Sequence, residues 1–120
     1  MFYASGGHRH ALLIGYTALD DSMATPLRTA NNVIGAVPDA TYQKSKHLVG
    51  EQATLYIYSD GVYEVEKSDG SMWHFEEFAD FMNTMDSGSQ SRLDRLCRHA
   101  ESIRNQDNFE DDFTIVEVAF

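Results

Sequence analysis

The first half of the chain alternates short apolar runs with glycines and polar residues. Residues 2–5 and 11–16 are two such runs, separated by a short glycine-rich segment, which predicts two strands with a tight connection. Residues 17–40 hold both prolines and several Asp, Asn and Thr, so they are predicted to form a long connection with a short strand near Val33. Residues 41–49 predict a weak, polar strand at a sheet edge.

The most apolar strand pattern covers residues 53–59 (ATLYIYS). Its apolar side chains fall on both parities, which predicts burial on both faces of a sheet. Asp60-Gly61 then predicts a break in the strand, because glycine adopts backbone angles that other residues avoid. Extended chain is expected again over residues 62–66, and Asp69-Gly70 is a hairpin turn signal.

Two helices and a final strand are predicted in the second half. Apolar residues recur at helical spacing from Phe75 to Met85, and residues 87–89 (SGS) are expected to end that helix. Ser91 with Asp94 resembles a capping box at the start of a second helix. Its apolar stripe consists of Leu93, Leu96, Cys97, Ala100 and Ile103. Residues 113–120 (FTIVEVAF) predict a last strand, so the order of elements indicates mixed α and β layers.

The charge balance restricts the classes of partner. Nine Lys and Arg stand against 19 Asp and Glu, giving a net charge of −10 and a pI of about 4.7. This argues against nucleic acid and anionic membranes as partners, since both need a cationic face. The acidity is compatible with a cation site, although a solvated acidic surface is the commoner origin of such a charge balance. Neither a signal segment nor a membrane-spanning run is found in the sequence, so a cytoplasmic protein is expected.

Other nucleophiles and soft ligands do not form a recognisable site. Cys97 is the only cysteine and lies on a helical stripe, so we interpret it as a small core residue. The histidines have no zinc-site spacing. Ser5 and Ser59 have no evident His and acid partners for a nucleophilic triad.

Three aspartates stand at the ends of predicted strands. Asp60 follows the apolar strand, and Asp111 and Asp112 precede the last one. If the two strands are antiparallel neighbours, the end of one adjoins the start of the other, and the three carboxylates meet on one rim. Such a cluster of oxygen ligands suits Mg²⁺ or Mn²⁺. The alternative is that each aspartate is an ordinary turn residue.

The order of motifs bears on that choice. Residues 3–8 (YASGGH) and 11–14 (ALLI) resemble the Y-A-S-x-G-H-P-P-A-L-L element of bacterial metal-dependent serine/threonine phosphatases. These enzymes form the type 2C, or PPM, superfamily, here in its sporulation stage II E (SpoIIE) branch. Ile34-Gly35 resembles the L-G step of that family.

Two later elements follow in the same order as in the family. Gly50-Glu51 with residues 55–64 (LYIYSDGVYE) is similar to G-D-x-L-x-L-Y-T-D-G-V-x-E. Residues 111–116 (DDFTIV) are similar to D-D-x-T-L-x-V. The four elements together extend over nearly the whole chain.

The resemblance implies a fold and an activity. The implied fold is α+β, a partial α-β-β-α sandwich of mostly antiparallel sheets with two consecutive helices packed on one face. The implied activity is hydrolysis of phosphoserine or phosphothreonine at a centre of two Mn²⁺ or Mg²⁺ ions. By this resemblance Asp60 and Asp111 are metal ligands, and Asp112 takes a neighbouring place where relatives carry Asp or Asn. No catalytic residue beyond the metal ligands is assigned.

The departures from the family pattern predict a reduced site. The G-G-D-x-x-D and D-x-x-G-H elements of the family's N-terminal half do not occur in this sequence. Residues 1–120 are therefore expected to form a single, incomplete domain, the C-terminal half of the phosphatase domain, with weak metal binding and impaired catalysis. Arg9 replaces part of the H-P-P motif and is a candidate for binding substrate phosphate, or else a surface residue. His8 is a second substrate-binding candidate, or else a loop residue.

Two functions of different classes follow. The first is a bacterial protein phosphatase domain in signal transduction, acting on a phosphorylated regulatory protein. The second is a non-catalytic signalling or interaction module derived from the same fold. Half a sheet leaves edges unpaired, so a homo-oligomer formed through the sheet edges is a further expectation.

Overall fold

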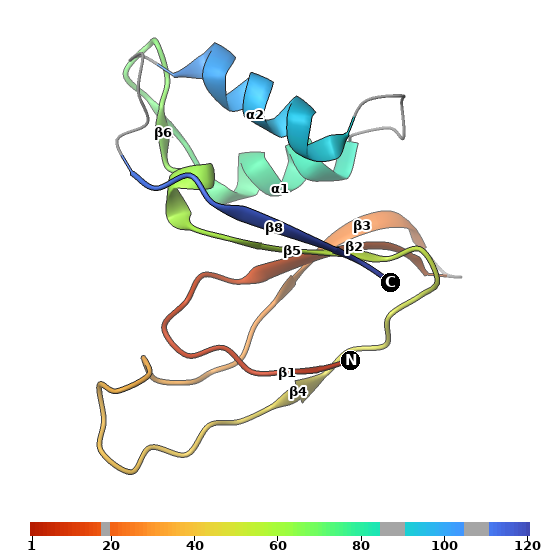
Figure 1. The fold of residues 1–120 in the computed structure, drawn as a ribbon, viewed down its shortest axis with the longest axis vertical. Helices are drawn as coiled ribbons and strands as arrows, with labels where there is room; N and C mark the ends of the chain where they lie inside the picture. Colours follow the sequence, from red (N-terminus) through yellow and green to blue (C-terminus); the bar gives the residue numbers. More distant parts are fainter. Residues whose placement is uncertain (18–19, 85–90, 105–110) are drawn as a thin grey trace. The chain divides into compact units, whose positions relative to one another are not determined.

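The computed structural model describes residues 1–17, 20–84, 91–104 and 111–120 and shows an α+β fold with antiparallel strands (Figure 1). This confirms the predicted fold class. The chain divides into two compact units, residues 1–57 with 116–120 and residues 58–115. The packing of the helices on a sheet face stays a prediction.

A four-stranded sheet forms most of the first unit. Its order is β3 (Asp20–Leu27), β2 (Ala11–Thr17), β5 (Thr54–Tyr58) and β8 (Ile115–Ala119). β2 runs antiparallel to both neighbours, with Leu12 opposite Tyr56 in β5. β8 is also antiparallel to β5, since the Phe120 N–H donates to the Ala53 carbonyl at one end and Ser59 pairs with Thr114 at the other.

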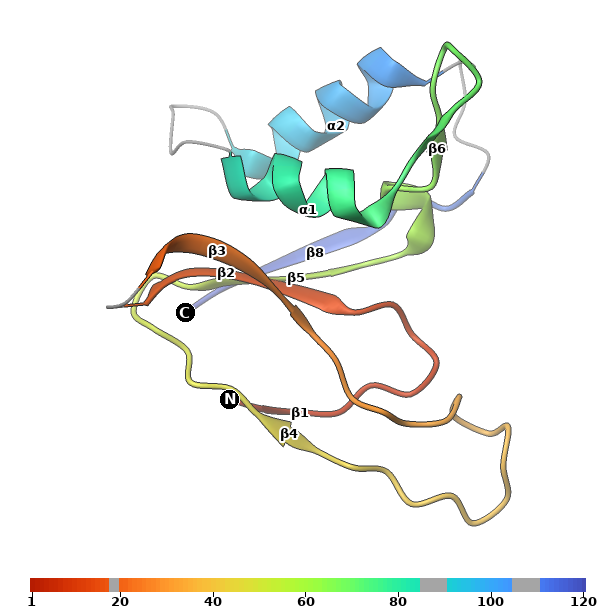
Figure 2. The same ribbon diagram turned by 180° about the vertical axis from the view of Figure 1, so that it is seen from behind.

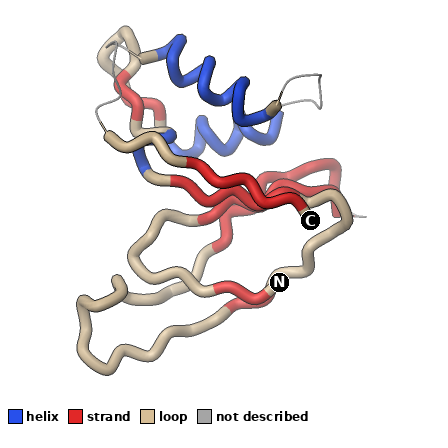
Figure 3. Tube along the Cα trace, viewed as in Figure 1, coloured by secondary structure: helices blue, strands red, loops and turns tan. Residues whose placement is uncertain are grey.

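The predicted connection over residues 17–40 is wrong in its first part, where β3 pairs with β2. The prolines and turn-forming residues of this segment concealed the strand, but β3 is an edge strand, where the missing N–H of Pro26 is tolerated. Val33 lies outside any strand, in the long loop between β3 and β4 that Figure 3 draws in tan.

The predicted tight connection between the first two apolar runs is also wrong, because these runs lie in different sheets. β1 (Phe2–Tyr3) pairs instead with β4 (Ser45–Lys46) in a separate two-stranded ladder. The predicted strand over residues 41–49 therefore exists, but as two residues only. The segment 4–10 carries the chain from this ladder to the main sheet, so it is a crossover between sheets and no hairpin turn.

The core of the first unit lies on β2. Leu12, Leu13 and Ile14 are all buried, so both faces of this strand are covered. On β5, by contrast, Tyr56 is buried and Ile57 is 42% exposed. The predicted burial on both faces of residues 53–59 is thus wrong at the end of that strand. Leu13 of β2 forms a buried cluster with Leu27 of β3 and Ala53, and burying each large apolar side chain contributes about 1.5–3 kcal/mol.

Near the start of the second unit, the 3₁₀ turn η1 (Asp60–Val62) makes the break predicted at Asp60-Gly61, while the extended chain predicted over residues 62–66 is a strand only at its end. A hairpin of β6 (Val65–Glu66) and β7 (Met72–Trp73) follows, as the Asp69-Gly70 signal predicts. The helices α1 (Phe75–Thr84) and α2 (Arg92–Ile103) lie side by side (Figures 1 and 2). In the described parts of the chain, no helix has the length and apolar character needed to cross a membrane.

The helices enclose a small aromatic core. Phe78 and Met82 of α1 and Leu96 and Ala100 of α2 are fully buried, as their spacing predicts. Ser91 is the N-cap of α2 but makes no side-chain capping bond, so the predicted capping box is wrong. Met85 and the predicted stop at residues 87–89 lie outside the described residues.

Cys97 is partly buried on α2, in keeping with its predicted place on the apolar stripe. Burial, with the charges of Glu101 and Asp94, raises the pKa of its thiol. A raised pKa keeps the thiolate scarce at neutral pH, which disfavours a nucleophilic role.

His99 of α2 is expected to make the stability of this core depend on pH. Its ring stacks on Phe81, with ring centres 4.2 Å apart, and contacts Trp73 edge-on. This burial, with the nearby Lys67 charge, lowers the pKa of His99 below its ordinary value of 6.5. Between the two pKa values the unfolded chain binds a proton that the folded chain does not bind. The free energy of unfolding should therefore decrease as the pH falls below about 6.5.

Urea denaturation between about pH 5 and pH 8 measures this effect. His99→Phe keeps the ring contacts and removes the titration, so its stability should depend less on pH than that of the wild type. His74→Gln, at an exposed histidine of the same unit, is the matched control. An unchanged pH dependence in His99→Phe would contradict the role given to His99.

Candidate functional site

The end of β5 and the start of β8 lie side by side, as expected for antiparallel neighbours. The Ser59 N–H donates to the Thr114 carbonyl at 2.9 Å, which continues the pairing beyond both strands. Residues 59–61 and 111–114 therefore form a junction within the second unit. The three predicted aspartates all stand in these two segments.

The Ser59 side chain fastens this junction. Its Oγ donates to the Asp112 carbonyl and accepts from the Thr114 N–H at 3.0 Å. One hydroxyl thus satisfies two main-chain groups of the opposite segment. This role was not predicted from the sequence, where Ser59 is recognisable only as a possible nucleophile. The available signal was its position, next to Asp60 and opposite the Asp111–Asp112 pair in the expected strand pairing.

Gly61 allows the two segments to approach closely. It is buried, and a Cβ atom at this position would lie 2.7 Å from the Asp112 carbonyl oxygen and 3.2 Å from the Asp111 carbonyl carbon. The first distance is shorter than real side chains allow, and the obstructing atoms are main chain. Glycine is therefore required here by space, and the Asp-Gly pair is more than a turn signal.

The local backbone then turns away from the junction. The Asp60 carbonyl accepts the N–H groups of Tyr63 and Glu64, at 3.0 and 2.9 Å, and so closes the turn η1. Asp60 is half-buried, whereas Asp111 and Asp112 are exposed. The Asp112 N–H donates to Asp111 Oδ1 at 2.8 Å, which orients the Asp111 carboxylate.

The donor chemistry of these residues fits part of a hard-cation site. Carboxylate oxygens are the ligands that Mg²⁺ and Mn²⁺ prefer, and the junction brings their two segments into contact. Over residues 1–17, 20–84, 91–104 and 111–120, however, no three or more His, Cys, Asp or Glu side chains are grouped so that they could hold a metal ion. The described residues thus fit one side of such a site without completing it. The ligand roles of Asp60, Asp111 and Asp112 stay predictions.

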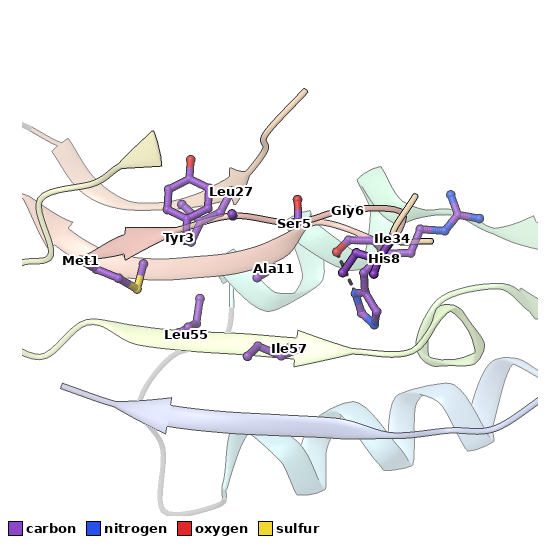
Figure 4. A pocket seen from close by; sticks show the side chains of 12 residues that line it. Met1, Tyr3, Ser5, Gly6, His8, Ala11, Leu27, Ile34, Leu55 and Ile57 are labelled. Atoms are coloured by element: carbon purple, nitrogen blue, oxygen red, sulfur yellow. Dashed lines mark hydrogen bonds between the residues drawn. The ribbon is translucent and has the colours of Figure 1, made fainter. Parts of the chain in front are cut away.

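The two predicted substrate-binding residues lie in the first unit. Arg9 and His8 are exposed and both line a pocket of about 290 Å³ (Figure 4). His8 Nδ1 donates to the Arg9 carbonyl oxygen at 3.0 Å. This bond holds the His8 ring against its own loop. Because both residues line a pocket, either of them is compatible with a binding role. Their contact with a substrate stays a prediction.

Comparisons with known proteins bear on the family and on the fold. Residues 1–120 match the family described as Stage II sporulation protein E (SpoIIE). The structure is similar to the SiaA-PP2C domain of Pseudomonas aeruginosa, with a TM-score of 0.67 and 18% sequence identity. That alignment covers 93% of this chain and 44% of the other, so this chain spans less than half the length of that structure. At this identity the likeness shows the fold alone. A search of curated protein sequences finds no match.

The junction can be tested through Ser59. Ser59→Ala leaves the Asp112 carbonyl and the Thr114 N–H without their side-chain partner, so the free energy of unfolding should drop by about 1 kcal/mol. Hydrogen exchange at the Thr114 amide should become faster, and Ser59→Thr, which keeps the hydroxyl, should restore most of both properties.

Ser102→Ala is the matched control, because the Ser102 hydroxyl donates within its own helix, to the His99 carbonyl. Its effect on stability should stay within about 0.5 kcal/mol. If hydrogen exchange at the Thr114 amide is no faster in Ser59→Ala than in Ser102→Ala, the Ser59 side chain does not stabilise the junction.

Proposed function

The chain belongs to the Stage II sporulation protein E (SpoIIE) family, and we propose on this premise that it carries the C-terminal part of a protein phosphatase site. The proposed reaction is metal-dependent removal of phosphate from a Ser or Thr of a cytoplasmic regulatory protein in bacterial signalling. The observation that carries the proposal is the junction, in which Ser59 and Gly61 hold the Asp60 segment against Asp111 and Asp112.

In this proposal the three aspartates contribute oxygen ligands to Mn²⁺ or Mg²⁺. When bound, these ions activate a water molecule and neutralise charge on the phosphoryl oxygens. The chain's own task is positioning. Ser59 holds the main chain of residues 112–114, and the Asp112 N–H orients the Asp111 carboxylate. Arg9 is proposed to bind the substrate phosphate through its planar guanidinium group, with His8 beside it.

The second candidate is a non-catalytic signalling module on the same fold. It is favoured by one observation: the part of the chain that the structure describes contains no group of three metal-ligating side chains. The strand β8 lies at the sheet edge with Val116 half exposed, which supports a homo-oligomer formed through this edge. Light scattering at increasing protein concentration tests that association.

An activity assay separates the two candidates. The chain alone should hydrolyse a phosphoserine peptide little or not at all with Mn²⁺, because its ligand set is incomplete. A chimera that joins the N-terminal half of an active phosphatase of this family to residues 1–120 should be active. In that chimera Asp60→Ala and Asp111→Ala should each reduce kcat at least about a hundredfold, as expected for the loss of a metal ligand.

Asp80→Ala, which removes an exposed carboxylate from α1, is the matched control and should leave kcat unchanged. Circular dichroism establishes that each chimera is folded. A folded chimera without Mn²⁺-dependent hydrolysis would overturn the phosphatase proposal in favour of the non-catalytic module. Activity that is equally high in Asp60→Ala would show that Asp60 is no ligand.

A further inference from the structure

The pocket of the first unit has a largely apolar lining. Tyr3, Ala11 and Leu27 lie along one side, Leu55 and Ile57 of β5 lie opposite, and Ile34 and His8 stand at one end (Figure 4). Its volume of about 290 Å³ is at the lower limit of ligand sites, which suits one or two side chains better than a large cofactor. Arg9 also lines the pocket and adds a positive charge to it.

A hydrogen-bond network fixes the loop that frames the pocket. Asn31 Nδ2 donates to the Ser5 carbonyl at 3.0 Å and to the Gln43 carbonyl at 2.9 Å. The Thr29 hydroxyl donates to the same Ser5 carbonyl at 2.9 Å. The Ile34 N–H donates to the Gly6 carbonyl at 3.2 Å, which places Ile34 at the pocket. The pocket is therefore formed before any ligand arrives, and binding has little ordering cost.

The same loop exposes apolar side chains next to the pocket. Ile34 is 74% exposed and Val33 is 57% exposed. Gly7 has a φ of 84° and packs so closely on Val33 that a Cβ atom there would lie 2.8 Å from Val33 Cγ1. Apolar surface that is held in place in this way and left open to water is typical of a binding surface.

Two arginines lie near this pocket in a chain whose net charge is strongly negative: Arg9 lines the pocket, and Arg28 follows Leu27, which also lines it. Burial, with the nearby charges of Arg28 and Arg9, lowers the pKa of His10. Residues 24–50 carry Arg28, Lys44 and Lys46 against a single acidic residue, Asp39. Residues 58–115 carry 14 acidic and five basic residues. Residues 1–57 as a whole are balanced, so Arg9 at the pocket provides a local attraction for an acidic ligand, whereas the second unit repels such a ligand.

We propose that this pocket and the loop of residues 29–43 bind an acidic peptide segment of a partner protein. An aliphatic or aromatic side chain of the segment enters the apolar pocket, and a flanking carboxylate contacts Arg9. The apolar lining provides affinity, and the cationic residues select acidic neighbours. This interaction goes beyond the proposed function, since it requires neither metal nor phosphate.

A titration followed by nitrogen–proton NMR tests the proposal on the whole chain without metal. The probe is a synthetic peptide with one leucine between aspartates. Its addition should shift the amide signals of Gly6, Ala11, Leu55 and Ile57. The same peptide with serine in place of leucine should bind at least about tenfold more weakly, because the buried apolar side chain is lost. A peptide with lysines in place of aspartates should also bind more weakly, and added salt should weaken the binding of the acidic peptide.

Variants of the chain locate the contact. Ala11→Phe fills the pocket and should abolish binding, and Arg9→Gln should weaken binding about two- to fivefold. Arg98→Gln, which removes the same charge from the second unit, should leave the affinity unchanged. Ile34→Ser alters a side chain that is already exposed, so it should keep the fold and still weaken binding, even if Ala11→Phe does not fold.

Three results would overturn the proposal. The first is a set of shifts outside the pocket and its loop. The second is equal affinity for the leucine and serine peptides, or for the wild type and Ile34→Ser. The third is a dimer that covers this face, detected by light scattering and abolished by Ile34→Ser.

Discussion

The hydrogen bonds that join residues 59–61 to residues 111–114 are the constraint on which the candidate site depends. About fifty residues of chain separate these segments, and closing so long a loop has an entropic cost. The intervening residues offset this cost by folding as a unit with its own aromatic core. The second unit thus begins and ends at the junction, and the placement of the three aspartates depends on the folding of the hairpin and both helices.

The two units differ in charge, and this difference separates two kinds of chemistry. Residues 58–115 hold most of the acidic residues, including all three predicted metal ligands, and they attract cations. Residues 1–57 are electrically balanced, with four acidic and four basic side chains. Their pocket offers an apolar lining and Arg9, which is suited to an anionic segment with an apolar side chain. A single acidic chain can in this way present surfaces for ligands of opposite charge.

The sequence predicted the elements whose signal is local. Helical spacing located α1 and α2, and the Asp69-Gly70 turn located the β6–β7 hairpin. The elements that were not predicted depend on the position of distant partners. β3 contains Pro26, which a strand tolerates at the edge of a sheet, and β1 pairs with β4 more than forty residues away.

The same distinction holds for the candidate site. The approach of the Asp60 segment to residues 111–114 followed from the expected antiparallel neighbours. Two other features of the site were not predicted: the hydrogen bonds of the Ser59 hydroxyl and the close approach of the main chain at Gly61. Both involve main-chain atoms, whose positions a residue pattern does not specify.

Paramagnetic broadening by Mn²⁺ tests the central claim most directly, because it detects even weak binding at individual amides. If the junction presents one cation-binding edge, a low concentration of Mn²⁺ should broaden the amide signals of residues 60–61 and 111–112 together. Asp60→Asn should reduce the broadening of the amide signals of Asp111 and Asp112 as well as that of residue 60. Broadening at Asp111 and Asp112 that is unchanged in Asp60→Asn, or no broadening at either segment, would contradict the claim.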